Sequence, residues 1–349
     1  MHGGRIYEIA KMLQVPREEI LDFSASVNPF GMDPGLQKEL ERTLKDLVYY
    51  PDIHMLGLEE KIGQKHGLLP EEVFLGNGAN SILYRLYGFF ARKKMLLPVP
   101  SFETYEKAAK AWGIEVSHYF LKDWRIQEDF LEGLQENVGL VTLCNPNNPT
   151  GMLAESGILM EIVRKCREHH IFLLMDECFL SMVPEGEKYS LIPLLFKNPH
   201  VGVLRSFTKI FSIPGLRLGY FLCSSREIMG FLHSMTPDWD VNTLALAAGA
   251  YCIKQNPQGM VQTLDQERCL LSKRLEAMGI RVFPSRANFL LCYFKENLYQ
   301  PLLQKKIIIR DCSDFLGLGP GFFRVAVRRR EENLRLCQAL ERIIKGENG

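Results

Sequence analysis

The sequence predicts an α/β protein with a mostly parallel sheet, helices on both faces of that sheet, and a smaller α+β domain at the C-terminal end. Between Val73 and about Ser225, short apolar runs alternate with helical stretches, which is the pattern of strand–helix units in a parallel sheet. From Thr243 the pattern changes to a long helical region, several short strands and a closing helix. The length of 349 residues suits one large and one small domain.

The large domain is predicted to follow a short N-terminal arm. Residues 1–30 form this arm, with a helix near Ile6–Leu13 and a turn at Ser24–Gly31. Residues 31–235 form the large domain, which begins with helical periodicity at Leu36–Leu47 and Leu58–His66. Its predicted strands are the apolar runs Met95–Val99, Leu140–Cys144, Ile171–Met175, Val201–Leu204 and Tyr220–Cys223.

Residues 236–349 are predicted to form the small domain. A helical region extends from Thr243 to Met278, and residues Glu331–Ile344 give a closing amphipathic helix. The strands predicted between them are Arg281–Phe283, Phe289–Tyr293, Ile307–Ile309 and Phe323–Val327.

The stretch around Lys209 carries the most informative chemical pattern of the chain. Lys209 comes shortly after the apolar run Val201–Leu204. Hydroxyl groups at Ser206 and Thr208 lie beside it, and Arg217 comes eight residues later. A lysine amine forms a Schiff base with an aldehyde, and hydroxyl and guanidinium groups bind phosphate oxygens. Pyridoxal 5′-phosphate (PLP) offers both an aldehyde and a phosphate. In isolation the same residues also suit a surface lysine beside a structural Pro-Gly turn.

Three other segments supply groups that fit the same cofactor. The strand Leu140–Cys144 runs into an Asn-Pro-Gly loop in which Asn148 can donate a hydrogen bond to a cofactor oxygen. The strand Ile171–Met175 ends at Asp176, whose carboxylate can keep the pyridine nitrogen protonated. A glycine-rich loop at residues 76–80 precedes a helix whose first N–H groups can bind phosphate. Each segment alone is also compatible with a plain loop, or with a helix cap at the acidic pair.

Together these segments resemble a known family. In chain order they are the glycine loop, the Asn-Pro-Asn-Asn-Pro-Thr-Gly loop at 145–151, the Asp-Glu pair at 176–177 and the Ser-x-Thr-Lys-x-x-x-x-Pro-Gly-x-Arg segment at 206–217. About 30 residues separate each of the last three from the next, which is about one strand and one helix. The combination resembles the fold-type I PLP enzymes of the class I/II aminotransferase superfamily.

Within that superfamily the chain is most similar to threonine-phosphate decarboxylases, and next to histidinol-phosphate aminotransferases. The similar segments are Met1–Tyr7, Ile20–Gly31, Leu204–Lys209, Ile307–Cys312 and Phe322–Arg328. The resemblance implies PLP-dependent decarboxylation of L-threonine O-3-phosphate to the aminopropanol phosphate used in cobalamin assembly, through an aldimine and a quinonoid. An aminotransferase acting on histidinol phosphate or an aromatic amino acid remains the alternative. A non-catalytic PLP-fold binding protein is a third reading.

The resemblance also implies a role for each site residue. Lys209 and Asp176 are the expected catalytic residues, with Lys209 holding the cofactor and Asp176 facing its pyridine nitrogen. Asn148 is expected at the ring hydroxyl, and Phe102 is expected to stack on the ring. The residues expected around the cofactor phosphate are Gly78, Ala79, Asn80, Ser206, Thr208, Arg217 and, from a neighbouring subunit, Tyr50. The expected substrate-binding residues are His2, Gly3, Asn28, Asn148, Arg310 and Arg324, of which Arg324 holds the substrate carboxylate.

One position departs from the aminotransferase pattern. Phe179 stands three residues after the aspartate, where aminotransferases often have tyrosine. A phenyl ring cannot hydrogen-bond the cofactor ring oxygen, so Asn148 is expected to act alone there. The decarboxylase resemblance tolerates phenylalanine at this position.

Charge and composition argue against several other classes of protein. The 42 basic and 41 acidic residues give a net charge of +1, which provides no electrostatic basis for binding nucleic acid or a membrane surface. The nine cysteines contain no C-x-x-C motif and are expected to be buried thiols in a reducing compartment. The adjacent His169 and His170 do not converge on one point, so no metal is predicted.

The cellular setting is predicted to be cytoplasmic. Glu8 and Lys11 interrupt any N-terminal apolar run, and the uncharged stretch near Val241–Ile253 is too short to span a bilayer. The expected ligand is a small phosphorylated amino acid, and the family resemblance implies a homodimer.

Overall fold

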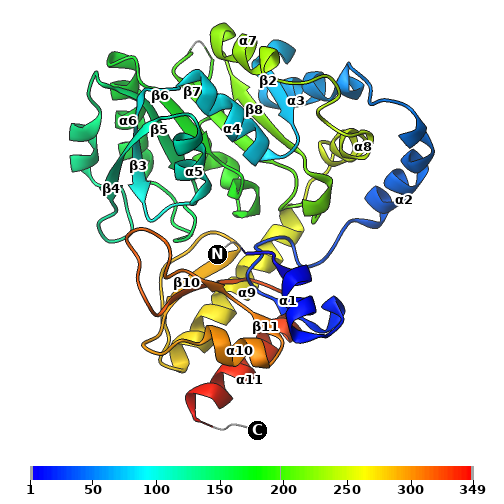
Figure 1. Cartoon of the computed structure of the whole chain (residues 1–349), viewed down its shortest axis with the longest axis vertical. Coiled ribbons are helices and arrows are strands. Elements are labelled where there is room, and N and C mark those ends of the chain that lie inside the picture. Colours follow the sequence, from blue (N-terminus) through cyan, green and yellow to red (C-terminus); the bar gives the residue numbers. More distant parts are fainter. Residues whose placement is uncertain (1–2, 197, 347–349) are drawn as a thin grey trace.

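The computed structural model describes residues 3–196 and 198–346. Figure 1 shows a larger upper part built on one sheet and a smaller lower part built on another, with the long helix α9 (Gln258–Ala277) running down into the lower part. No helix of the described segments has both the length and the apolar character that crossing a membrane requires.

The larger part contains a seven-stranded sheet with the strand order β2-β8-β7-β6-β5-β3-β4. Neighbouring strands from β7 to β4 are parallel, whereas β8 runs antiparallel to both β7 and β2. The predicted mostly parallel sheet is therefore confirmed. The strands are β2 (Val73–Gly76), β8 (Gly219–Cys223), β7 (Val201–Ser206), β6 (Phe172–Asp176), β5 (Val138–Cys144), β3 (Lys94–Val99) and β4 (Glu115–Phe120).

Helices cover both faces of this sheet, as predicted. Buried residues of one face pack against α2 (Pro34–Thr43), α3 (Leu58–His66), α6 (Ser156–Glu168) and α8 (Thr243–Cys252). Those of the other face pack against α4 (Ala79–Phe89), α5 (Thr104–Ala111) and α7 (Arg226–Ser234).

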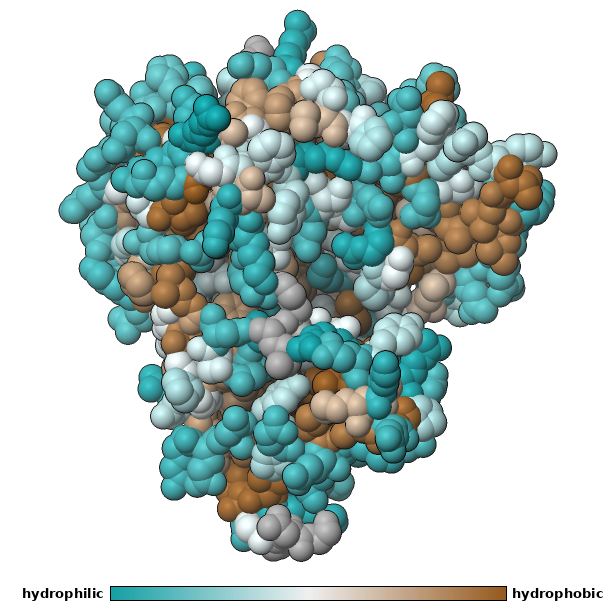
Figure 2. All heavy atoms as spheres, viewed as in Figure 1, coloured by the Kyte–Doolittle hydropathy of each residue, from teal (hydrophilic) through white to brown (hydrophobic). Residues whose placement is uncertain are grey.

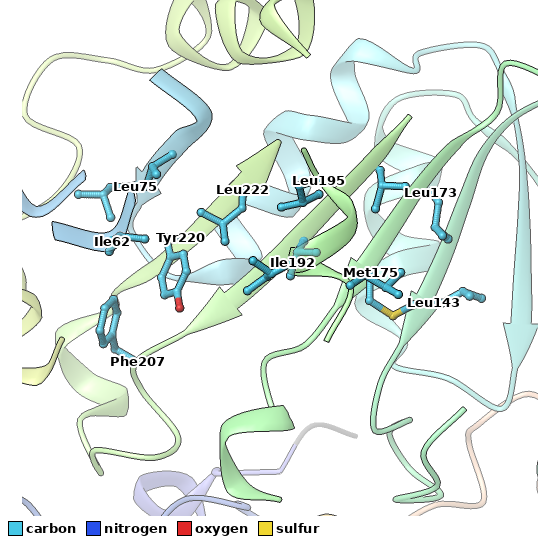
Figure 3. Close-up of a cluster of buried hydrophobic side chains, with 14 of the residues drawn as sticks. Ile62, Leu75, Leu143, Leu173, Met175, Ile192, Leu195, Phe207, Tyr220 and Leu222 are labelled. Atoms are coloured by element: carbon cyan, nitrogen blue, oxygen red, sulfur yellow. The ribbon is translucent and has the colours of Figure 1, made fainter. Parts of the chain in front are cut away.

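Alternate residues of each strand enter these two cores, because side chains of a β-strand point to opposite faces. In β6, Leu173 and Met175 enter the first core, while Phe172 and Leu174 enter the second. Both faces are apolar because helices cover both faces of the sheet. Figure 3 shows the first core, in which the labelled side chains are Ile62, Leu75, Leu143, Leu173, Met175, Ile192, Leu195, Phe207, Tyr220 and Leu222.

The smaller part contains a four-stranded antiparallel sheet with the order β12-β13-β10-β9. One core lies between this sheet and the helices α9 and α11. The remaining elements are α1 (Ile6–Leu13), β1 (Leu21–Asp22), β9 (Arg281–Val282), β10 (Phe289–Tyr293), α10 (Tyr299–Gln304), β11 (Ile307–Ile308), β12 (Arg310–Asp311), β13 (Phe322–Ala326) and α11 (Arg330–Ile344).

The N-terminal arm is joined to the smaller part. Strand β1 of the arm pairs in parallel with β11, through Leu21 with Ile307 and Asp22 with Ile308. In addition, Ala326 N–H donates a 2.8 Å hydrogen bond to the Phe23 carbonyl. The buried residues of α8 belong to the main core of the larger part. The domain boundaries at residues 30 and 235 stay predictions.

The prediction differs from the structure at three places. The helical region Thr243–Met278 is two helices, because Pro257, which has no N–H group, stands at the N-cap of α9. The predicted strand Ile307–Ile309 is two strands, since the chain changes its pairing partner at Ile309 from β1 to β13. The edge strand β4 was not predicted. Its half-buried residues include Ser117 and His118, so it lacks an apolar run.

A buried ion pair links the ends of β6 and β7. Arg205 donates a 2.9 Å hydrogen bond from Nε to Glu177, and its terminal nitrogens bind Glu187 at 2.9 and 3.0 Å. Glu177 is fully buried and also accepts from Leu191 N–H and Ser190 Oγ at 2.8 Å.

We expect Arg205→Ala to lower the free energy of unfolding by about 3 kcal/mol, because the change leaves the Glu177 carboxylate buried and uncompensated. Denaturant unfolding of the protein measures this loss. Arg164→Ala, which removes the exposed ion pairs of Arg164 with Glu161 and Glu168, is the control and should have little effect. An equally small effect at both positions would contradict the prediction.

Glu59, in the first turn of α3, gives the fold a pH dependence. Its Oε1 atom is buried and has no hydrogen-bond partner among the described residues. Burial raises the pKa of the Glu59 carboxyl to about 7. Because this pKa is raised, the contribution of the Glu59 carboxyl to the free energy of unfolding is complete below its ordinary pKa. That contribution is lost as the pH rises through about 7.

Glu59→Gln should therefore stabilise the protein at pH 8 by about 2 kcal/mol and have a much smaller effect at pH 5. Unfolding midpoints of wild type and variant between pH 5 and pH 8 test this. Glu60→Gln changes the exposed neighbouring side chain and should show no such dependence on pH. The prediction would be contradicted if the unfolding midpoints of Glu59→Gln and wild type differed by the same amount at every pH.

Candidate active site

A cavity of about 510 Å³ lies at the carboxyl ends of β5, β6 and β7, where ligands bind in sheets of this kind. The arm, the start of α4 and strand β13 complete its walls. The predicted site residues that line it are Gly3, Ala79, Asn80, Phe102, Asn148, Asp176, Ser206, Thr208, Lys209, Arg217 and Arg324.

Lys209 is partly buried in this cavity. Its Nζ donates a 3.3 Å hydrogen bond to Thr208 Oγ1 and lies 5.5 Å from the centre of the Phe179 ring. Its backbone is fixed from the arm, because Asn28 N–H donates a 2.9 Å hydrogen bond to the Lys209 carbonyl. The backbone that carries the amine is therefore fixed at the edge of the cavity, and the amine itself contacts Thr208.

A cluster of donors lies near the start of α4. The hydroxyls of Ser206 and Thr208 are 2.8 Å apart. Gly78 has φ of +82°, and a Cβ atom there would lie 2.6 Å from the Arg217 guanidinium, so glycine permits this close approach. Ala79 begins α4, and the first N–H groups of a helix have no partner within it. Two hydroxyls, a guanidinium and a helix N-terminus form a suitable site for a phosphate group.

Asp176 is the last residue of β6 and is buried beside this cavity. The Tyr105 hydroxyl donates a 2.7 Å hydrogen bond to Asp176 Oδ2, and Cys178 N–H donates one of 2.9 Å to Oδ1. Strand register sets its position, since Asp176 pairs with Cys144 of β5 and with Leu204 of β7. Both carboxylate oxygens are thus held in a fixed orientation.

Arg324 of β13 enters the cavity from the smaller part. It is 7% exposed, and it donates hydrogen bonds to Asn148 Oδ1 and, at 3.0 Å, to the Ser24 carbonyl. Its Nε has no partner among the described residues. Burial lowers the pKa of the Arg324 guanidinium to about 10, and the nearby Arg310 charge acts in the same direction. This buried cation suits an anionic ligand.

The other predicted residues lie outside the cavity wall. Asn28 binds the Ile210 carbonyl and accepts from Phe30 N–H, so it is bonded to the Lys209 segment. Arg310 lies opposite Arg324 in the β12–β13 pair and lines a neighbouring recess together with Phe102. Tyr50 is 77% exposed and stacks on Trp239 at 4.4 Å. His2 lies outside the described residues.

Sequence reasoning did not identify several residues of the cavity wall. Tyr105 is the most informative of these, because it contacts Asp176 directly. Its position three residues after Phe102, at the start of a helix, places the two side chains on neighbouring positions and could have indicated it. Cys144, Cys178, Tyr84 and Thr104 also line the cavity, and no local pattern distinguishes them from core residues.

Comparisons with known proteins agree with this geometry. The family model for aminotransferase class I and II matches residues 18–340. The chain is 33% identical to the threonine-phosphate decarboxylase of Salmonella typhimurium over 354 residues, which cover 99% of this chain and 97% of that protein. The crystal structure of the histidinol-phosphate aminotransferase from Clostridium acetobutylicum has a TM-score of 0.87 and 28% identity, covering 94% of this chain and 100% of that one.

A decarboxylase structure is similar to the same extent. The crystal structure of L-threonine-O-3-phosphate decarboxylase from Porphyromonas gingivalis has a TM-score of 0.84 and 25% identity, covering 93% of this chain and 100% of that one. The chain belongs to the class I and II aminotransferase family. It has the fold-type I architecture, it is an enzyme of the decarboxylase or aminotransferase kind, and its cofactor is PLP.

The residues present fit this cofactor. Lys209 offers an amine to the aldehyde, and the donors at the start of α4 suit the phosphate. Asp176 offers an oriented carboxylate that would suit the ring nitrogen, and Phe102 offers an aromatic face that would suit the ring. Asn148 directs its side-chain oxygen at Arg324, so its amide N–H groups are the part that suits a cofactor oxygen.

Proposed function

We propose that this enzyme decarboxylates L-threonine O-3-phosphate to aminopropanol phosphate. The observation that carries the proposal is Arg324, a buried guanidinium at the cavity whose Nε has no partner within residues 3–196 and 198–346. A buried arginine of this kind is suited to a bidentate contact with a substrate carboxylate. The two decarboxylases named above support the reaction, since one is 33% identical over nearly the whole chain.

PLP supplies an electron sink that stabilises the negative charge left on the substrate α-carbon. The protein would determine which bond at that carbon is broken, by the orientation in which its residues hold the substrate. Arg324 comes from β13 of the smaller part and Lys209 from the larger part, so the two would approach the substrate from different walls of the cavity, with Arg324 on the carboxylate. Lys209 Nζ, held beside Thr208 Oγ1, would then deliver a proton to the α-carbon after carbon dioxide leaves.

Aromatic residues exclude water around the carboxylate site. Phe179 and Phe289 pack edge to face at 5.1 Å, and the Arg324 guanidinium lies 4.7 Å from the centre of the Phe289 ring. A dry environment strengthens the contact between arginine and carboxylate. Gly3, which lines the cavity, and Arg310, which lines a recess that shares Phe102 with it, would contribute to binding the substrate phosphate or carboxylate.

Product analysis with O-phospho-L-threonine tests the proposal. We expect release of carbon dioxide and formation of aminopropanol phosphate, with no requirement for 2-oxoglutarate. Glutamate formation that depends on 2-oxoglutarate, without carbon dioxide, would instead assign the enzyme to the aminotransferases, as the resemblance to the Clostridium acetobutylicum enzyme allows.

We further propose a homodimer in which Tyr50 reaches the partner's cofactor phosphate. Apolar side chains are exposed on the segment that follows α2, at Leu44, Leu47, Val48, Tyr49 and Ile53. Figure 2 shows apolar surface at the right edge of the molecule, where Figure 1 places α2. A continuous exposed patch of this kind is typical of an association surface.

Mixed dimers test this arrangement. Lys209→Ala and Tyr50→Ala are each expected to be inactive or weakly active alone. Unfolding and refolding them together should restore activity, because each mixed dimer would then contain one site with both wild-type residues. No recovery in mixtures that sedimentation shows to be dimeric would contradict a site shared between subunits.

A further inference from the structure

Asp176 is held by a tyrosine that the functional assignment does not use. Tyr105 is buried, and its hydroxyl donates the 2.7 Å hydrogen bond to Asp176 Oδ2. Cys178 N–H occupies a position on the other oxygen at 2.9 Å. A carboxylate has about four acceptor positions, so these two bonds orient it and leave acceptor positions for a further donor.

The strand explains why these two groups meet. Leu174 enters the core that α5 covers, and Asp176 lies two residues further along β6, so it faces the same side as α5. Tyr105 lies in the first turn of α5. Glu177 points to the opposite face, where it binds Arg205.

The same segment also sets the position of Phe102. The rings of Phe102 and Tyr105 pack edge to face, with centres 5.7 Å apart and planes at 87°. Phe102 is proposed to lie on the face of the cofactor ring, and Asp176 at its nitrogen. The start of α5 therefore supports both contacts at once.

We propose that Tyr105 is a positioning residue that fixes Asp176 as an oriented anion toward the ring nitrogen of the bound cofactor. The hydroxyl and Cys178 N–H each hold one oxygen of the carboxylate, and a carboxylate held at the ring nitrogen favours the protonated ring. The inference rests on the proposed place of Asp176 at that nitrogen.

The environment keeps the tyrosine protonated. Burial, together with the nearby Asp176 charge, raises the pKa of Tyr105 well above its ordinary value. The hydroxyl therefore remains a hydrogen-bond donor over the pH range in which enzymes of this kind are assayed.

The test compares two ligands that differ only at the ring nitrogen. Dissociation constants of PLP and of its 1-deaza analogue, which has carbon at that position, are measured with the cofactor-free protein. Wild type should prefer PLP, and Tyr105→Phe should reduce this preference about tenfold, the order expected for a hydrogen bond to a charged group.

Tyr87→Phe is the matched control. Tyr87 is buried in the same core, and its hydroxyl is hydrogen-bonded to Thr142 Oγ1 at 2.7 Å. Removing it deletes one buried hydroxyl without touching the Asp176 carboxylate, so the preference for PLP should stay at the wild-type value. If losing a tyrosine hydroxyl only disturbed the fold, the affinities for PLP and for the 1-deaza analogue would fall equally.

A wild-type preference in Tyr105→Phe would overturn the inference. The variant Asp176→Asn distinguishes this result from failure of the proposed function. If that variant also kept the wild-type preference for PLP, Asp176 would not be the residue that faces the ring nitrogen. If Tyr105→Phe does not fold, 3-fluorotyrosine placed at position 105 is the second variant. Its more acidic hydroxyl is a stronger donor and should increase the preference, and an unchanged preference would again overturn the inference.

Discussion

Replacing Lys209 by alanine should abolish covalent attachment of the cofactor and lower kcat by about 10⁴-fold. The reason is that Lys209 Nζ is both the proposed attachment point and the proposed proton donor. Borohydride reduction of the holoenzyme followed by peptide mapping measures the first property. Single-turnover assays with the phosphorylated substrate measure the second.

Lys107 provides a control for the labelling experiment. Its side chain also lines the cavity, so it is a second amine near the cofactor. Lys107→Ala should leave the reduced cofactor on the peptide that contains Lys209. Labelling that persists in Lys209→Ala, or that disappears in Lys107→Ala, would contradict the assignment.

Arg324→Ala should lower kcat/KM for a carboxylate-bearing substrate by about 10³-fold, the order expected when one partner of a buried, hydrogen-bonded charge pair is removed. Binding of aminopropanol phosphate, which lacks the carboxylate, should change little in the same variant. Arg324→Lys should recover only part of the loss, because an ammonium group cannot make the bidentate contact.

Arg281→Ala is a suitable control for Arg324. Arg281 lies in β9 of the same small sheet, and its guanidinium stacks over Phe283 at 4.9 Å. It does not line the cavity described here. Equal weakening of substrate and aminopropanol phosphate by Arg324→Ala would show that the arginine supports the cavity rather than the carboxylate.

The strands and helices of the large sheet could be predicted from the sequence because both of its faces are covered. Continuous apolar runs such as those of β5 and β6 are a strong signal. The edge strand β4 carries no such run, since it is only partly buried, and it was missed. The break between α8 and α9 could have been predicted from Pro257.

Those candidate site residues that come at the end of a buried strand could be predicted from the sequence. Asp176, Ser206 and Lys209 all lie at or just after the carboxyl end of a buried strand. The spacing from Phe102 could have indicated Tyr105 as a residue near the site, but its contact with Asp176 depends on how α5 packs across the sheet. The position of Arg310 beside Phe102 likewise depends on how the two parts of the molecule meet.

The bond from Asn28 N–H to the Lys209 carbonyl has a consequence for the order of assembly. The arm that carries Asn28 is anchored by pairing with β11. During synthesis, the arm therefore cannot take its final position until residue 308 has left the ribosome. A contact between such distant positions forms late because a long loop must close first. The hydrogen bond from Asn28 to Lys209 would therefore form only after the seven-stranded sheet around Lys209 is complete.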